Sequence, residues 1–422
     1  MRVEPPSGPF SAELRLPGDK SLSHRALILA AMADGTSSLQ GLGTGADVAS
    51  SAAALRALGV DIDGSVVSSP GVEGWTPPSG PLDAGNSGTT MRLLAGALGA
   101  RLFRTTITGD ESLLARPMGR LVAPLQALGV SIDTAPGGKP PIAVGAADRL
   151  KGADVVIEVA SAQVRSAFQL AAIQAEGSSA ITSPPGYRDH TEKWLQSLGL
   201  GRDEGGGRFT IEPGPVPTLD IAIPGDASSA AFLWASAAMT AGAEITTQQI
   251  TLNSGRTGFL EVLDAMGASV HVAVTGDVLG DPIGDVTVGG AMLTAIEVSG
   301  DLTARCLDEL PLVAVIASVA QGVTTVHDAA ELRIKESDRV TSTVEMITGL
   351  GGMATAYEDG FSVIGVERLS GGTVAAHGDH RLAMAAAVAA AGGDAVEIDG
   401  ADVAAVSWPN FFETLEAVWS SR

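Results

Sequence analysis

Apolar residues at helical spacing recur along the chain, and each run ends in a small residue that precedes a short alternating stretch. This pattern predicts an amphipathic helix followed by a strand. The five copies span residues 53–63, 122–133, 191–201, 260–272 and 344–356, and a sixth helix is predicted over 409–419.

A second pattern alternates with the first and consists of an Ala-rich apolar run, a glycine and then a Thr/Val-rich stretch. Because these runs are apolar on every face, they predict fully buried helices, each ended by a glycine and followed by a strand. The six copies begin near Arg25, Met91, Phe168, Ala230, Leu312 and Leu382.

Together the two patterns predict six α/β units of roughly 70 residues, since Gly59, Gly129 and Gly199 mark the first three at intervals of 70 residues. Six units of one design favour two domains of three units each, whereas solenoid repeats are usually shorter. The Pro-rich segment 213–226 is the best candidate for a linker.

Composition narrows the class of protein. The 422 residues include 26 Lys+Arg and 48 Asp+Glu, so the formal charge is 26 − 48 = −22, which argues against nucleic acid and anionic membranes as partners. A hydrophobic content of 45% supports a sizeable core. A single cysteine, Cys306, the lack of a signal-peptide pattern and short apolar runs predict a cytoplasmic protein.

Five segments place positive charge beside Gly and Ser or at the start of a predicted helix. Free backbone N–H groups there, with Lys or Arg, are typical of an anion site, although solvated charges on capped helices fit as well. In the last segment His377, Asp379 and His380 suggest a metal, but no third-ligand motif follows, and presentation of Arg381 on a helix is the alternative. The segments are 17–25, 85–92, 109–120, 331–339 and 377–384.

Two of these segments carry local predictions. In 109–120, Arg116 precedes a proline that is expected to start a helix near Met118. In 331–339, a surface helix is expected to make Lys335 and Arg339 neighbours one turn apart.

Eight motifs in a fixed order resemble the EPSP synthase family, the 3-phosphoshikimate 1-carboxyvinyltransferases, from about residue 10 to residue 415. Their forms are most similar to the bacterial class II type of this enolpyruvyl transferase family. The motifs are PGDKSLSHR, NSGTTMR, RPMGRL, SAQVRSA, RDHTEKW, LDELP, ELRIKESDR and GDHRLAM.

The resemblance implies a two-domain inside-out α/β barrel in which each domain has three βαβαββ units with buried helices and outer sheets. One domain is expected over 1–18 plus 225–422 and the other over 19–224, with the active site in the cleft that closes over the substrates. It further implies a monomer without metal or cofactor, and inhibition by glyphosate in competition with phosphoenolpyruvate.

The implied reaction transfers the enolpyruvyl group of phosphoenolpyruvate to the 5-hydroxyl of shikimate 3-phosphate and releases phosphate. C3 of phosphoenolpyruvate gains a proton, the hydroxyl loses one as it attacks C2, and the tetrahedral intermediate then expels phosphate. Carboxylates and a lysine suit these proton transfers, and Arg and Lys suit the two anionic substrates.

The resemblance also implies residue roles. Asp308 or Lys335 takes the hydroxyl proton, Glu336 protonates C3, and Lys20 and His380 act at the reacting centre. The shikimate 3-phosphate ligands are Lys20, Ser21, Arg25, Ser161, Ala162, Gln163, Arg188, Asp308 and Lys335. The phosphoenolpyruvate ligands are Lys20, Asn86, Gly88, Thr89, Arg116, Gln163, Arg339 and Arg381.

The sequence departs from the enteric form of the family at three positions. Val406 stands where that form has a lysine contact with phosphoenolpyruvate, Glu331 replaces an asparagine, and Ala162 replaces a serine. Two alternatives remain: the sister enzyme that acts on UDP-N-acetylglucosamine, against which the missing loop cysteine argues, and a non-catalytic binding module on the same scaffold.

Overall fold

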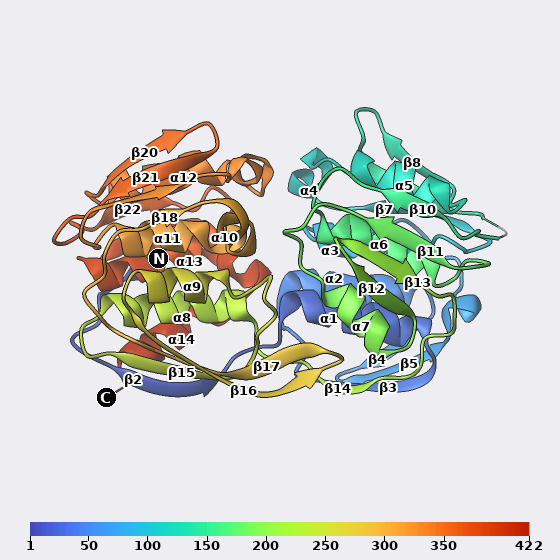
Figure 1. The fold of residues 1–422 in the computed structure, drawn as a ribbon, viewed down its shortest axis with the longest axis horizontal. Helices are drawn as coiled ribbons and strands as arrows, with labels where there is room; N and C mark the ends of the chain where they lie inside the picture. The colour runs from blue at the N-terminus through green and yellow to red at the C-terminus, as the bar shows by residue number, and fades with distance from the viewer. Residues whose placement is uncertain (148, 422) are drawn as a thin grey trace. The chain divides into compact units, whose positions relative to one another are not determined.

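The computed structural model describes residues 1–147 and 149–421, which divide into two compact units (Figure 1). Unit 1 comprises Met1–Pro17, Pro224–Gly276 and Pro282–Arg422, and unit 2 comprises Gly18–Ile223 and Asp277–Asp281. The short segment 277–281 is the turn of a hairpin, and neither the sequence pattern nor the resemblance indicated that it packs with unit 2.

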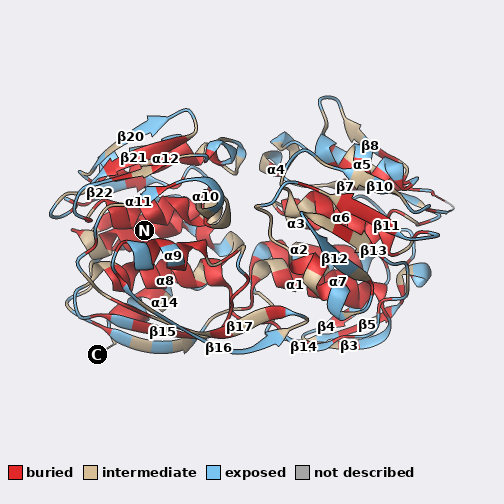
Figure 2. Ribbon diagram, viewed as in Figure 1, coloured by how far each residue is buried: buried red, intermediate tan, exposed pale blue. Residues whose placement is uncertain are grey.

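Each unit is built on three buried helices, coloured mostly red in Figure 2. In the last of them, His380–Ala389, every residue is buried, as expected for an Ala-rich helix that is apolar all round. The prediction of six buried helices is thus confirmed. They are α1 (Lys20–Met32), α3 (Gly88–Ala97) and α6 (Ala162–Ala172) in unit 2, and α8 (Ala227–Met239), α11 (Leu310–Ala317) and α13 (His380–Ala389) in unit 1.

Six further helices flank the buried ones and keep one polar face, as the amphipathic pattern predicted. In unit 2 these are α2 (Ala46–Ala57), α5 (Val122–Ala127) and α7 (His190–Ser197). In unit 1 they are α9 (Gly258–Ala265), α12 (Arg339–Gly349) and α14 (Phe411–Trp419). Two short helices, α4 (Glu111–Ala115) and α10 (Gly300–Arg305), complete the set in the described residues.

Three four-stranded sheets surround the helices of unit 2, and each joins a parallel pair to an antiparallel hairpin. The first has the order β14 (Asp220–Ala222), β3 (Asp34–Gln40), β5 (Val66–Pro70), β4 (Asp61–Asp63). The second is β6 (Leu82–Asp83), β7 (Arg104–Thr108), β9 (Lys139–Gly145), β8 (Ile132–Ala135). The third is β10 (Asp154–Val156), β11 (Ser179–Thr182), β13 (Arg208–Ile211), β12 (Gly201–Gly205).

Unit 1 repeats this design in two four-stranded sheets and a smaller third one. The first has the order β16 (Ser269–Val278), β17 (Asp281–Gly289), β15 (Glu244–Thr251), β2 (Ser11–Arg15). The second is β18 (Glu297–Val298), β19 (Val323–Val326), β21 (Gly360–Ile364), β20 (Met353–Tyr357). The third is β1 (Arg2–Val3), β23 (Val396–Asp399), β22 (Gly372–Ala375). Within each unit the apolar helices therefore lie inside and the sheets outside, which confirms the expected fold class.

A close approach of two buried helices fixes the middle of unit 2. A Cβ added at Gly96 on α3 would lie 2.0 Å from the carbonyl oxygen of Ala167 on α6, so only glycine fits at this crossing. The N-terminal parts of the same two helices also meet, because Gln163 of α6 donates a hydrogen bond to Thr89 of α3 at 2.8 Å.

Two local expectations hold in position, and the structure adds detail to each. The helix expected near Met118 begins as the 3-10 turn η2 (Gly119–Leu121) and continues as α5, because Pro117 cannot extend the preceding α4. The candidate linker 213–226 contains the passage from unit 2 to unit 1 after Ile223, and part of it forms strand β14, which pairs with β3. No helix in the described part of the chain has the length and apolar character needed to span a membrane.

Candidate active-site residues

The N-terminus of α1 presents Lys20 beside an acidic partner. Asp19 caps the helix by accepting a hydrogen bond from the backbone N–H of Leu22 at 2.9 Å. The Lys20 ammonium donates to Asp47 Oδ2 at 3.1 Å, and its side chain stays a quarter exposed. Asp47 was not among the predicted residues, although it supports one of them.

Arg25 lies on the same helix, buried, and donates only to neutral oxygens in its three hydrogen bonds. Its acceptors are Thr191 Oγ1 at 2.8 Å, the Ser21 carbonyl at 2.9 Å and Ser166 Oγ at 2.9 Å. Burial lowers the pKa of Arg25, nearby carboxylates oppose this shift, and the Arg188 guanidinium lowers the pKa further. Arg188 and Arg25 therefore repel each other electrostatically, and a bound anion would relieve this repulsion.

A second set of polar groups gathers at the start of α3. Ser87 caps the helix, and Arg116 donates to Asn86 Oδ1 at 2.6 Å. A Cβ added at Gly88 would lie 2.7 Å from Arg92 Nη1 and 3.7 Å from Arg116 Nη1. Backbone N–H groups at a helix start and two guanidinium groups thus face one small space, an arrangement that suits an anion.

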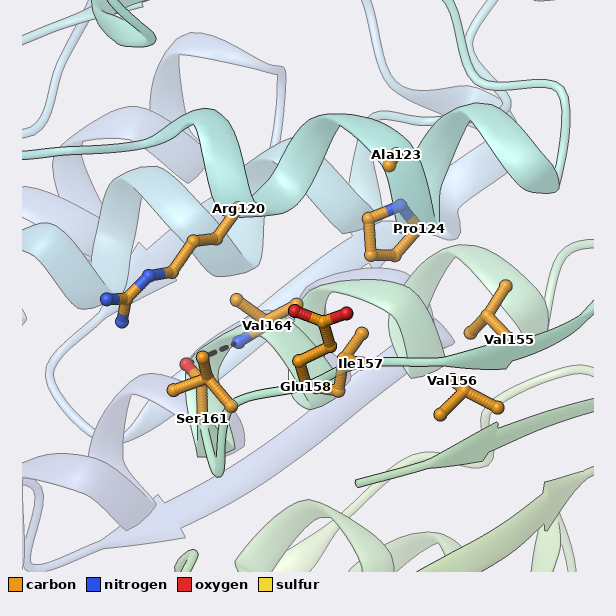
Figure 3. Close-up of a pocket in the computed structure, with 10 residues that line it drawn as sticks. Arg120, Ala123, Pro124, Val155, Val156, Ile157, Glu158, Ser161 and Val164 are labelled. Carbon is orange, nitrogen blue, oxygen red and sulfur yellow. Dashed lines mark hydrogen bonds between the residues drawn. The ribbon is translucent and has the colours of Figure 1, made fainter. Parts of the chain in front are cut away.

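The start of α6 is joined to this set through Gln163. Its amide nitrogen donates to Thr89 Oγ1 at 2.8 Å, and its amide oxygen accepts from Arg92. Ser161 caps α6 and accepts from the Val164 N–H at 3.5 Å, the bond dashed in Figure 3. Beside Ser161 lies a mostly apolar cavity of about 410 Å³, lined on its other side by Pro124 of α5.

A buried chain of side chains links α1, α2 and α3. His24 Nδ1 lies 2.8 Å from Ser51 Oγ, which lies 2.8 Å from Thr90 Oγ1, which in turn donates to Ser87 Oγ at 2.8 Å. Burial, together with the charges of Lys20 and Arg25, lowers the pKa of His24 to about 3. His24 is therefore neutral at physiological pH, and the helix starts that carry the candidate residues are tied together.

In unit 1 the candidate residues meet on the Arg339 guanidinium, whose side chain is 1% exposed. Arg339 donates to Asp379 Oδ2 at 2.7 Å, Glu336 Oε2 at 2.7 Å and Asp308 Oδ1 at 3.2 Å. Burial disfavours charge at both Arg339 and Asp379. The ion pairs nevertheless raise the pKa of Arg339 and hold the pKa of Asp379 below its ordinary value. One arginine thus orients three carboxylates.

The remaining cations of this cluster surround Asp308. Lys335 Nζ lies 3.7 Å from Asp308 Oδ1, and Arg381 Nη2 lies 3.7 Å from Asp308 Oδ2. Arg381 Nη1 also donates to the Asp308 carbonyl and to Glu309 Oε1, each at 3.2 Å. His380, buried, is the first residue of α13, whose N-cap is Asp379.

The helix expected over 331–339 is wrong. The structure has the 3-10 turn η4 (Ala330–Ile334), an extended Lys335, and α12 beginning only at Arg339 with Asp338 as its N-cap. Arg333 explains the break, because it bonds the Glu358 carbonyl at 2.7 Å and Asp338 at 2.7 Å instead of a helical neighbour.

The predicted residues form one cluster in each unit. The supporting residues Asp47, Arg92 and Glu309 were missed, and Asp379, considered only as a metal ligand, instead bonds Arg339. Arg92 and Glu309 stand inside the motifs NSGTTMR and LDELP, so their position beside a predicted residue was the available signal. Among the described residues, no group of three or more His, Cys, Asp or Glu side chains is arranged to hold a metal ion.

Solved structures with similar folds identify the class of protein. An enolpyruvyl transferase from Streptomyces tendae has a TM-score of 0.76 at 17% identity and covers 99% of this chain and 96% of its own. EPSP synthase from Acinetobacter baumannii has a TM-score of 0.88 at 35% identity, with 99% and 97% covered. The fold is that of the enolpyruvyl transferases.

Sequence comparison then identifies the family. The pattern of EPSP synthase, 3-phosphoshikimate 1-carboxyvinyltransferase, matches residues 5–415. A protein of that name from Halorhodospira halophila is 43% identical to this chain, over 97% of this chain and 94% of the relative. The protein of that name from Bacillus subtilis is 40% identical, over 96% of each chain. The chain belongs to the EPSP synthase family, as the motifs predicted, and UDP-N-acetylglucosamine as acceptor is not favoured.

Proposed function

We propose that the cluster in unit 2 binds shikimate 3-phosphate as the acceptor of the enolpyruvyl group. The support is Arg25, a buried cation whose hydrogen bonds go to neutral oxygens and which the Arg188 guanidinium repels. A phosphate dianion would add charge-assisted hydrogen bonds to such cations. The proposed ligands from this unit are Lys20, Ser21, Arg25, Ser161, Ala162, Gln163 and Arg188, with Ala162 contributing only its backbone.

Phosphoenolpyruvate is proposed to bind at the start of α3. The N–H groups beside Gly88, the Asn86–Arg116 pair and the Gln163–Thr89 pair supply donors for a phosphate or carboxylate. Lys20, Arg339 and Arg381 complete the proposed ligands. Because Arg339 already bonds three carboxylates, Arg381 is the better direct ligand of the two, and Arg339 contributes chiefly its charge and its hold on the carboxylates.

The proton transfers are assigned to the cluster in unit 1, and one observation carries this assignment: Arg339 holds both Asp308 and Glu336, at 3.2 and 2.7 Å. In the proposed mechanism Glu336 protonates C3 of phosphoenolpyruvate, and Asp308 with Lys335 accepts the proton of the 5-hydroxyl. The tetrahedral intermediate then returns the proton from C3 and expels phosphate, assisted by Lys20 and His380.

The acceptor is tested by phosphate release with phosphoenolpyruvate as donor. Shikimate 3-phosphate should support turnover and UDP-N-acetylglucosamine should not. Turnover with the nucleotide sugar alone would contradict the proposal, and binding of shikimate 3-phosphate without any turnover would indicate a non-catalytic binding module.

The residue roles are tested with Asp308→Ala and Glu336→Gln. General acid–base catalysis contributes about 10²–10⁴-fold, so kcat should fall by about that factor while the affinity for shikimate 3-phosphate stays within about threefold. Glu345→Gln, a substitution at an exposed carboxylate on α12, serves as the matched control and should leave kcat unchanged. Turnover of Asp308→Ala within about tenfold of the parent would refute the assignment of Asp308 as base.

Glyphosate is proposed to compete with phosphoenolpyruvate, because a small anionic phosphonate can use the same donors at the start of α3. Inhibition should weaken as phosphoenolpyruvate is raised at fixed shikimate 3-phosphate. An inhibition curve that stays flat to millimolar glyphosate would contradict this proposal.

A further inference from the structure

Glu309, the residue after Asp308, is a carboxylate with no place in the roles assigned so far. It ends the 3-10 turn η3 (Leu307–Glu309), precedes α11, and is 1% exposed. Its Oε1 accepts from Ser228 Oγ and from Arg381 Nη1, the latter at 3.2 Å. Its Oε2 is buried without a hydrogen-bond partner among the described residues.

The anchor of Glu309 is itself rigid. Ser228 stands in the first turn of α8, and its backbone N–H donates to the N-cap Asp226 at 2.7 Å. Asp226 is in turn fixed by Arg256, whose Nη2 donates to it at 2.7 Å. Glu309 therefore transmits the position of the α8 N-terminus to the group on its other side, Arg381.

The Arg381 guanidinium contacts Glu309 on one side and Asp308 on the other. Its Nη1 divides its hydrogen bonds between Glu309 Oε1 and the Asp308 carbonyl, and its Nη2 is directed to Asp308 at the longer distance of 3.7 Å. A buried carboxylate is costly unless it is paired, and here the pairing falls on one oxygen only. The arrangement is thus poorly explained as a stabilising ion pair. It is well explained as a brace for Arg381, by which we mean a contact that fixes the orientation of the guanidinium group.

We propose that Glu309 is a positioning residue that holds Arg381 in the orientation needed to bind phosphoenolpyruvate. The inference rests on the proposed role of Arg381 as a ligand of that substrate. It assigns to Glu309 no contact with substrate, so its effect passes through Arg381 alone. A displacement of a positioned group by about 1 Å can lower an enzymatic rate by up to about 10²-fold. We therefore expect a large rise in KM for phosphoenolpyruvate when Glu309 is replaced.

Three nearly isosteric or charge-preserving variants test the brace. Glu309→Met removes the acceptor without opening a cavity, and Glu309→Asp keeps the charge but withdraws it by one methylene. Both should raise KM for phosphoenolpyruvate by about tenfold or more, with KM for shikimate 3-phosphate changed less than about threefold. Glu309→Gln keeps an acceptor oxygen, so its KM for phosphoenolpyruvate should stay within about threefold of the parental value.

A double-mutant cycle shows whether the effect passes through Arg381. In an Arg381→Ala background, Glu309→Met should raise KM for phosphoenolpyruvate by less than about twofold further, because the group it positions is gone. Independent, multiplying effects of the two substitutions would overturn the proposal. An equal rise in both KM values, as expected for general loss of structure, would overturn it as well.

A thermal unfolding scan of Glu309→Met shows whether this variant folds. If it does not, Glu309→Asp decides: a folded Asp variant with the parental KM for phosphoenolpyruvate refutes the brace. Failure of the proposed function looks different, because then Arg381→Ala alone would leave KM for phosphoenolpyruvate unchanged.

Discussion

His24 makes the stability of unit 2 depend on pH in a way that a single substitution should remove. Its pKa is lowered by burial to about 3, against an ordinary value of 6.5. As the pH falls below the ordinary value, the unfolded chain takes up a proton at residue 24 and the folded protein does not, so folding loses stability. Integrated from about pH 7 to about pH 5, the loss is about 2 kcal/mol.

The assay is thermal unfolding of the parent protein and of His24→Gln at both pH values and equal ionic strength. A loss of about 2 kcal/mol in a unit of this size corresponds to roughly 4–8 °C in Tm. The variant should be less stable at neutral pH, because the hydrogen bond to Ser51 is altered. On acidification, the Tm of the variant should fall by roughly 4–8 °C less than the Tm of the parent.

His271→Gln is the matched control, because His271 is exposed on β16, and it should follow the parental trend. Asp379 does not interfere, since its lowered pKa means that its contribution is lost only below the ordinary range of an aspartate. Equal changes of Tm with pH in the parent and in His24→Gln would refute the reasoning.

Three further predictions follow from buried positions. Gly96→Ala should destabilise the protein by about 1–3 kcal/mol, measured as a lower Tm, because its Cβ would overlap the Ala167 carbonyl on α6. The control Gly80→Ala should leave Tm unchanged, because a Cβ at Gly80 meets no atom within 4 Å. Equal Tm values for the two variants would contradict the close packing. Gly88→Ala should raise both KM for phosphoenolpyruvate and the glyphosate concentration for half inhibition by displacing the Arg92 guanidinium, with little change in Tm; unchanged inhibition would argue against binding beside Gly88. Cys306, fully buried with a pKa raised by burial, should resist a thiol reagent at neutral pH until the protein is unfolded, and rapid labelling of the native protein would contradict its burial.

The sequence predicted the repeating elements well because their pattern is local. Each Ala-rich run has no polar face, so burial was the only consistent outcome. Five of the six amphipathic runs end at a glycine with positive φ, such as Gly59. The segment 331–339 failed for the opposite reason. Its course is set by bonds from Arg333 to the distant Glu358 carbonyl, and these override local helix preference.

The candidate residues were predictable by motif, but their connections were not. The partners of Arg339 lie 31 and 40 residues away in the chain, at Asp308 and Asp379, so no local spacing indicated that one guanidinium would hold them. The supporting role of Asp47 was hidden in the same way, 27 residues from Lys20. Long-range pairing of side chains is a property of the fold and has no signature in a single sequence.

The hairpin turn 277–281 has a consequence for dividing the protein into fragments. Asp281 pairs with His190 at 2.9 Å, and both side chains are fully buried in unit 2. A fragment cut at the two obvious boundaries, residues 18–223, would keep His190 and lose the Asp281 carboxylate. The buried imidazole would then lack this hydrogen bond, which is destabilising. A fragment meant to keep all of unit 2 would therefore need residues 277–281 grafted back onto residues 18–223.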